Sequence, residues 1–178
     1  MWIFLAGDAM SFGALLAGYG AIRAGSTDWP VPSEVLGISL TAFMTFLLIC
    51  SSLSMVKALS AIRHGDAKGM RNYLLLTIIG GVIFLGCQAY EWTHLIDAGL
   101  GLTTNPFGNY LFGTTFFAIT GFHGAHVTAG VIYLTCIMIQ GIRGKYSAAD
   151  NNKVEILGLY WHFVDLVWIM VFTFVYLL

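Results

Sequence analysis

Long apolar segments alternate with short polar ones along the whole chain. The apolar segments cover residues 1–23, 34–62, 72–97, 108–141 and 154–178. Each is longer than the ~20 residues that an α-helix needs to cross the hydrocarbon core of a bilayer. Open sheet edges are not viable in lipid, and segments this long and this few cannot close a barrel. The pattern therefore predicts an all-α integral membrane protein, a bundle of five transmembrane helices.

Composition supports this class and narrows the alternatives. The chain has 178 residues, of which 58% are hydrophobic and 10% charged, whereas a soluble domain carries about 25% charged residues. A net charge of −1 without a basic run argues against nucleic-acid binding. No repeat or low-complexity tract divides the sequence, so we expect one domain over residues 1–178. The segment at Met1 lacks a charged region before it, so we interpret it as a mature helix and not a signal peptide.

Basic residues are distributed unevenly among the connections between the apolar segments. Those near the second and fourth connections are Lys57, Arg63, Lys68, Arg71, Arg143, Lys145 and Lys153. Only Arg23 lies toward the opposite side. Loops rich in Lys and Arg stay on the cytoplasmic side of a membrane. The distribution predicts that the N-terminus lies inside and the C-terminus outside.

Ionisable side chains occur inside the apolar segments, where an acidic residue at a helix centre costs about 2.5–3.5 kcal/mol on insertion scales. They are Asp8, Glu91, His94, His123, His126, His162 and Asp165. With a rise of ~1.5 Å per residue, Asp8, the two histidines of the fourth segment, and His162 with Asp165 could form one polar layer in the inner half. Glu91 and His94 lie near the outer end of the third segment and share a helix face.

Three kinds of chemistry could explain these side chains. His123 or His126 could ligate a b-type haem together with His162, as in a membrane-anchor cytochrome. The acids Asp8 and Asp165 could take part in proton transfer, which intramembrane carboxyl groups often do. The third interpretation is structural, because hydrogen bonds between helices fix their register. No cluster with metal-ligand spacing is present, and Cys50, Cys87 and Cys136 are scattered singly.

Small and aromatic residues indicate how the helices pack. The chain has 21 glycines, which allow transmembrane helices to approach closely. Trp161 and Trp168 are seven residues apart, so they lie on a similar helix face, where packing in the core or at a protein interface is the favoured role. Aromatic residues near the segment ends, including Tyr176, are expected in an interfacial belt.

Several blocks of sequence resemble subunit III of the haem–copper terminal oxidases. They are MWIFLAGDAMSFGALLAGY, LLICSSLSMVKAL, FLGCQAYEWTHLI, FFAITGFHGAHVTAGVIYL and YWHFVDLVWIMVFTFVYLL. They occur in the family's order and cover essentially the whole chain. Many members have seven spans, and this chain resembles the five-helix form. The blocks GFHGAH and YWHFVD favour the cytochrome c-oxidising branch, whereas an aspartate at Asp8, where members often carry Glu, is similar to quinol-oxidising relatives.

The resemblance implies a noncatalytic subunit of a respiratory oxidase in a bacterial plasma membrane. It implies no catalytic residue, metal or haem on this chain, with the haems and copper held by partner subunits and phospholipid bound to this one. It also implies packing on subunit I and assembly with subunit II, and it leaves membership of a respiratory supercomplex open. Asp8 is the candidate for proton uptake; Glu91, His94, His123, His126, Trp161, His162, Asp165 and Trp168 are structural signature residues. We expect the partners of His162 and Asp165 on the fourth or first segment.

Overall fold

The computed structural model describes residues 1–147 and 151–178, and these are all-α, without strands. The long helices are α1 (Trp2–Ala24), α3 (Ile38–Arg63), α4 (Ala67–Asp97), α5 (Tyr110–Ile142) and α6 (Asn152–Val171). The short α2 (Pro32–Val35) precedes α3, and α6 continues into a π-helix, η1 (Phe172–Leu177). With η1 counted as part of α6, five helices in the described residues are long and apolar enough to span a membrane. This confirms the predicted fold class.

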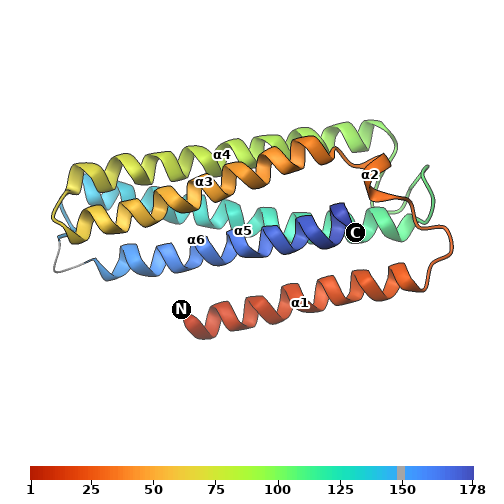
Figure 1. The fold of residues 1–178 in the computed structure, drawn as a ribbon, viewed down its shortest axis with the longest axis horizontal. Helices are drawn as coiled ribbons and strands as arrows, with labels where there is room; N and C mark the ends of the chain where they lie inside the picture. Colours follow the sequence, from red (N-terminus) through yellow and green to blue (C-terminus); the bar gives the residue numbers. More distant parts are fainter. Residues whose placement is uncertain (148–150) are drawn as a thin grey trace.

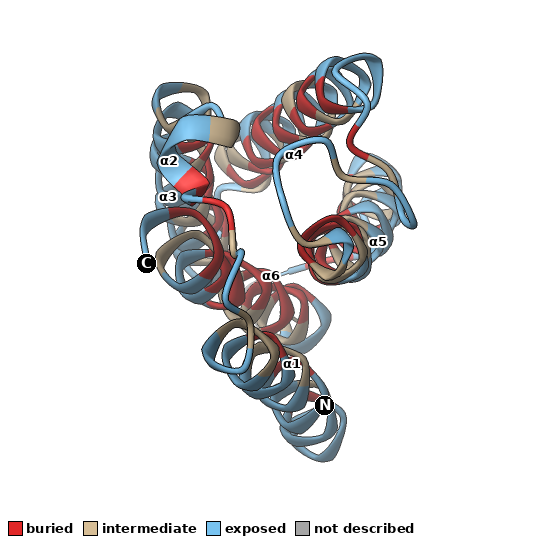
Figure 2. Ribbon diagram, turned by 90° about the vertical axis from the view of Figure 1, so that its right-hand side faces the viewer, coloured by how far each residue is buried: buried red, intermediate tan, exposed pale blue. Residues whose placement is uncertain are grey.

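The helices α3, α4, α5 and α6 form a four-helix bundle, and α1 packs on its outside against α5 and α6 (Figures 1 and 2). Buried positions face the interior of the bundle, while most of α1 is exposed (Figure 2). We call the end that holds the α3–α4 and α5–α6 connections the basic end, because the basic loop residues lie there. Figure 1 shows that α1 begins well short of the basic end.

Two helix boundaries differ from those predicted by hydropathy. The second apolar segment is interrupted, because α2 ends at Val35 and α3 begins only at Ile38. The third helix begins at Ala67 and not at residue 72, since the Asp66 side chain caps it by accepting hydrogen bonds from the next turn's backbone N–H groups. The predicted polar connection there is therefore largely helical. Part of the fourth connection, residues 148–150, lies outside the described residues.

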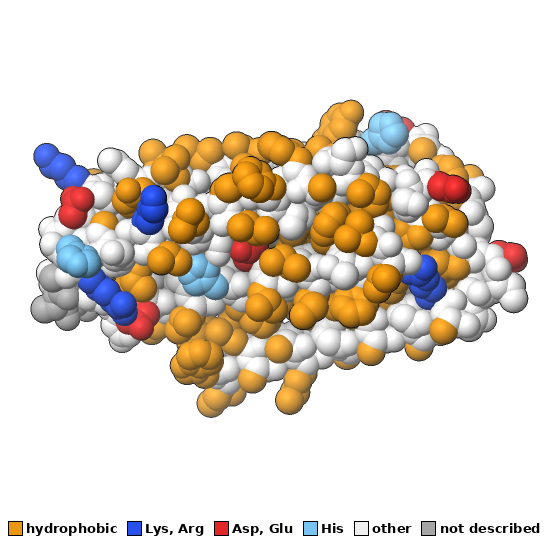
Figure 3. Space-filling model, in the orientation of Figure 1, with side chains coloured by type: hydrophobic (Ala, Val, Ile, Leu, Met, Phe, Trp, Pro, Cys, Tyr) orange, Lys and Arg blue, Asp and Glu red, His pale blue; other side chains and the backbone are white. Residues whose placement is uncertain are grey.

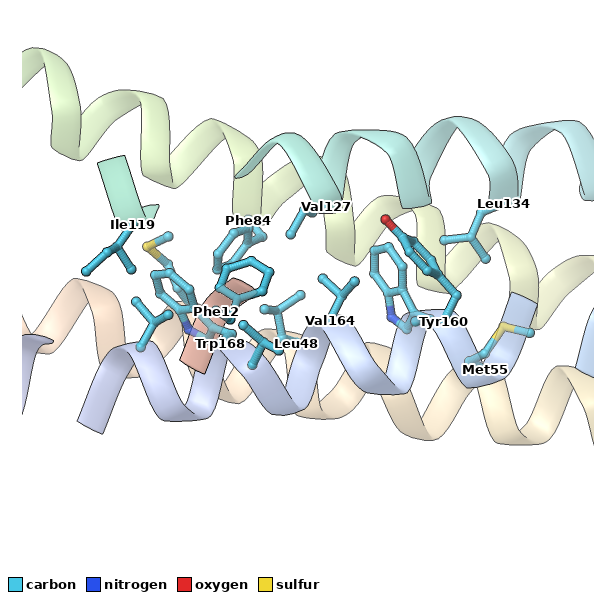
Figure 4. Close-up of a cluster of buried hydrophobic side chains, with 14 of the residues drawn as sticks. Phe12, Leu48, Met55, Phe84, Ile119, Val127, Leu134, Tyr160, Val164 and Trp168 are labelled. Atoms are coloured by element: carbon cyan, nitrogen blue, oxygen red, sulfur yellow. The ribbon is translucent and has the colours of Figure 1, made fainter. Parts of the chain in front are cut away.

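Side chains from all the long helices meet in the core. Along α1, the buried residues Leu5, Phe12 and Tyr19 recur every seven positions and form one stripe toward the bundle. Figure 4 shows Phe12 among core side chains of the other helices, with Phe84 of α4 near Trp168 of α6. The stripe explains how a peripheral helix is held by a single face.

Trp161 of α6 fills a notch formed by glycines of two other helices. A Cβ added to Gly81 of α4 would lie 2.8 Å from the Trp161 ring, and one added to Gly130 of α5 would lie 2.9 Å from it. Neither position can hold a larger residue without a shift of the indole. The glycines therefore set the distance between α6 and its neighbours, as the small-residue content predicted.

Candidate functional site

The carboxyl group of Asp8 on α1 and the imidazole of His126 on α5 face each other across the helix contact. The Asp8 Oδ2 atom lies 3.3 Å from His126 Nε2, and both side chains are about 15% exposed or less. The two atoms are close but are not aligned as a hydrogen bond. The other ring nitrogen, Nδ1, donates to the Phe122 carbonyl oxygen at 2.8 Å. A carbonyl can only accept, so Nδ1 carries a proton and Nε2 is the ring nitrogen that faces Asp8.

His123 lies one turn before His126 but is packed as an aromatic ring. It is fully buried, with its centroid 4.9 Å from that of Trp168 and 5.7 Å from that of Phe84. Among the described residues, neither ring nitrogen has a hydrogen-bond partner. His123 and His126 therefore occupy different environments, although both belong to the block TGFHGAH.

His162 and Asp165 meet Ser52 of α3, and not a residue of α5 or α1. The Ser52 Oγ atom lies 2.5 Å from His162 Nδ1, and the Ser52 side chain also interacts with the Asp165 carboxyl group. The expected location of their partners on the fourth or first segment is therefore wrong. The α3–α6 contact decides the pairing, because it turns this face of α6 toward the hydroxyl residues of α3.

The two signature tryptophans also bond to hydroxyl groups of α3. Trp161 Nε1 donates to Ser51 Oγ at 3.1 Å, and Trp168 Nε1 donates to Thr45 Oγ1 at 3.0 Å. Sequence reasoning missed these α3 partners. The signal that could have found them is the recurrence of hydroxyl residues at Thr41, Thr45, Ser51 and Ser52 within an otherwise apolar helix.

Glu91 and His94 flank a cavity of about 320 Å³ between α4 and the α2–α3 junction. Glu91 is buried and accepts hydrogen bonds from Tyr176 at 2.8 Å and Thr41 at 3.2 Å. His94 is exposed, with its ring 6.5 Å from that of Tyr90. Tyr176 is buried beside Glu91 and so does not belong to the predicted interfacial belt.

The structure separates the predicted polar layer into three environments. His126 is the central residue of α5, and Asp165 lies near the middle of the helix formed by α6 and η1. The position of this layer in the inner half of the membrane stays a prediction. His126 turns toward α1, His162 toward α3 and His123 into the aromatic core, so these histidines do not face one another as haem ligands would. Within the described ranges, no three His, Cys, Asp or Glu side chains gather as a metal group.

Comparison with known proteins places these features in a family. The family model described as "Cytochrome c oxidase subunit III" matches residues 21–178. Cytochrome c oxidase subunit 3 of Alkalihalophilus pseudofirmus is 33% identical over 99% of this chain and 84% of its own length. Quinol oxidase subunit 3 of Bacillus subtilis is 35% identical over the same shares of both chains.

Cytochrome c oxidase subunit 3 of Thermostichus vulcanus is 36% identical, again over 99% of this chain and 84% of its own length. Asp8 precedes the residues matched by the family model, but the relatives are aligned over nearly the whole chain. The length of the match, the order of the motifs and the helical architecture agree. The chain therefore belongs to the cytochrome c oxidase subunit III family.

Proposed function

We propose that this chain is the noncatalytic subunit III of a bacterial haem–copper oxidase and that it supports proton uptake through the Asp8–His126 pair. In this role it packs on the catalytic subunit I, joins subunit II in the complex and retains phospholipid. The haems and copper that reduce oxygen belong to the partner subunits. Family membership supports the assembly, and the position of Asp8 against His126 carries the proposal for the proton.

The Asp8–His126 pair can hold a proton between two transmembrane helices at low electrostatic cost. An isolated charge is expensive in hydrocarbon, whereas a carboxylate beside an imidazolium, or a carboxylic acid beside a neutral imidazole, is neutral as a pair. Once a small rotation of either side chain aligns Asp8 Oδ2 with His126 Nε2, 3.3 Å apart, a proton can shift between them without leaving an uncompensated charge. The hydrogen bond from Nδ1 to Phe122 keeps Nε2 directed at Asp8.

Large apolar side chains on the outer face of α1 supply a surface for lipid or for a neighbouring subunit. Ile3 is 91% exposed, Met10 76% and Trp2 72%. Such a surface is stable in a membrane protein because lipid chains or another transmembrane helix cover it. It supports the proposal that this subunit works inside a membrane-embedded complex in the bacterial plasma membrane.

Substitution of Asp8 by Asn in the intact oxidase complex tests the proton role. We expect slower proton uptake and faster inactivation during turnover, because an amide cannot take up the proton that the carboxylate shares with His126. Ser11→Ala is the matched control, since Ser11 is exposed on the same helix and its hydroxyl group bonds to the Gly7 carbonyl oxygen of its own helix. Unchanged proton uptake and unchanged inactivation in Asp8→Asn would reject the role.

The electron donor is tested on the complex and not on this chain. Relatives named for cytochrome c and for quinol match at similar identity, 33% and 35%. We propose a cytochrome c-oxidising complex, on the basis of the blocks GFHGAH and YWHFVD. The purified complex should oxidise reduced cytochrome c faster than a quinol; faster oxidation of the quinol would assign it to the other branch.

A further inference from the structure

A second polar site lies between α3 and α6, whereas the Asp8–His126 pair lies between α1 and α5. A cavity of about 150 Å³ opens there toward the basic end. Its lining residues are Met55, Val56, Leu59, Arg63, Glu155, Gly158, Leu159 and His162. The volume leaves room for several water molecules. Figure 3 shows, on this side of the molecule, a histidine and a nearby acidic side chain within the band of hydrophobic side chains.

Charged groups mark the mouth of this cavity. Arg63 of α3 and Glu155 of α6 form an ion pair of 2.9 Å, and their side chains are 49% and 45% exposed. Both residues lie at the ends of their helices nearest the basic end. A cavity that begins at a solvated ion pair is accessible to water, whereas an acyl chain would leave these charges without hydration.

His162 lies at the other end of the cavity and connects it to the helix interface. Its Nδ1 atom lies 2.5 Å from Ser52 Oγ, so Nε2 is the ring nitrogen available to the cavity. Ser52 also interacts with Asp165, one helical turn beyond His162 on α6. Asp165 is only 7% exposed, and its Oδ1 atom has no hydrogen-bond partner among the described residues.

We propose that Asp165 is a proton-binding carboxyl group that exchanges its proton with water at the basic end, through the α3–α6 cavity, His162 and Ser52. The ligand of this site is a proton delivered by water. A metal ion does not fit as well, because His162 and Asp165 are not joined by a third His, Cys, Asp or Glu within the described residues. The inference does not rest on the role proposed for Asp8.

The proton transfer balances without another reactant. A hydronium ion that enters the cavity from the basic end gives a proton to His162 Nε2 and becomes water, while Nδ1 gives its proton to Ser52 Oγ. The Ser52 hydroxyl group gives its own proton to the Asp165 carboxylate, which becomes a neutral carboxylic acid. His162 is left in its other neutral tautomer, and the reverse passage restores it. A hydroxyl group can serve in this way because it both donates and accepts.

The other charged and titratable groups around this path are few. Arg63 and Glu155 neutralise each other at the mouth. From α5, His123 packs on Trp168, one turn from Asp165. The neutral, protonated form of Asp165 is favoured because no cation among the described residues forms an ion pair with its carboxyl group, and an uncompensated charge is expensive at this depth.

Infrared spectroscopy of the intact oxidase complex in membranes tests the proposal. The carbonyl stretch of a protonated carboxyl group that disappears in Asp165→Asn identifies the Asp165 band. Transfer to D₂O should shift this band quickly in the wild type. Ser52→Ala should slow the shift about tenfold, the factor that ~1.4 kcal/mol of added barrier produces. Val56→Phe, at a half-exposed position that lines the cavity, should slow it as well.

Matched variants distinguish a block of the proposed proton path from a general loss of structure. Ser54→Ala removes a hydroxyl group that bonds only within α3, to the Cys50 carbonyl oxygen, and should exchange as the wild type does. Ser52→Thr retains the hydroxyl group and should restore exchange. Asp8→Asn should leave the Asp165 band intact, which distinguishes this site from the first. Absence of an Asp165 band, or equal exchange rates in Ser52→Ala, Val56→Phe and Ser54→Ala, would overturn the proposal.

Discussion

At the scale of single residues, buried polar groups are satisfied by hydroxyl side chains of distant helices. Glu91 of α4 accepts hydrogen bonds from Thr41 of α3 and from Tyr176 of η1. Thr41 Oγ1 also donates to the Gly37 carbonyl oxygen at 3.1 Å, so its single proton is shared between two acceptors. Tyr176 is therefore the more secure donor to the carboxylate.

We expect Tyr176→Phe to destabilise the protein by about 1–3 kcal/mol, the cost of leaving a buried polar group without its partner. Thermal unfolding of the detergent-solubilised chain measures the loss. Tyr110→Phe is the control, since Tyr110 is 56% exposed and its hydroxyl group can remain near water. An equal change in both variants would mean that the Glu91 bond contributes nothing specific.

At the scale of elements, the contacts of α6 connect several other helices of the bundle. It contacts α3, α5 and α1, and its two tryptophans bond to hydroxyl groups of α3. The π-helical turn that follows α6 places Tyr176 beside Glu91. π-Helical turns are rare and often occur at functional sites. The positions of α4 and α5 relative to α6 depend on the glycines beside Trp161.

We expect Gly81→Ala to cost about 1–3 kcal/mol, the usual penalty of overpacking a core, because its methyl group would meet Val131 Cγ2 at 2.7 Å and the Trp161 ring at 2.8 Å. Gly86→Ala is the matched control on the same helix, since an added Cβ there meets nothing within 4 Å. Thermal unfolding and the fluorescence of the tryptophans should change in the first variant only. A Gly81→Ala variant as stable as Gly86→Ala would show that the notch is not tightly packed.

At the scale of the whole molecule, the two ends of the bundle differ in their number of basic residues. Seven basic residues lie near the basic end, against one at the other end. The bundle is completed on one side by α1, which contacts α5 and α6 through one stripe. Because loops rich in Lys and Arg stay on the cytoplasmic side, we expect the basic end to face the cytoplasm, which is the orientation that both proton proposals assume.

Labelling of single cysteines in intact cells tests the orientation. With Cys50, Cys87 and Cys136 replaced by Ser, a Thr104→Cys variant in the α4–α5 connection should react with a membrane-impermeant maleimide from outside. A Lys68→Cys variant at the start of α4 should react only after the membrane is permeabilised. The opposite pattern would reverse the predicted topology and place the α3–α6 cavity on the outer side.

The sequence by itself determined the number of long helices, their approximate limits and the family. It could do so because spans need long apolar runs, which hydropathy detects, and because motifs such as TGFHGAH and YWHFVD are contiguous in the chain. The Asp66 cap and the break before Ile38 shifted boundaries by a few residues. Those shifts reflect local hydrogen bonds that hydropathy does not register.

Only the tertiary structure decided which polar groups meet. Asp8 pairs with His126, whereas His162 pairs with Ser52 and His123 is enclosed by aromatic rings. Spans that are apolar on nearly every side carry little periodicity to show which face turns inward, since lipid covers an apolar face as readily as another helix does. The faces are chosen instead by close contacts at glycines such as Gly81 and Gly130 and by hydrogen bonds between residues far apart in the chain.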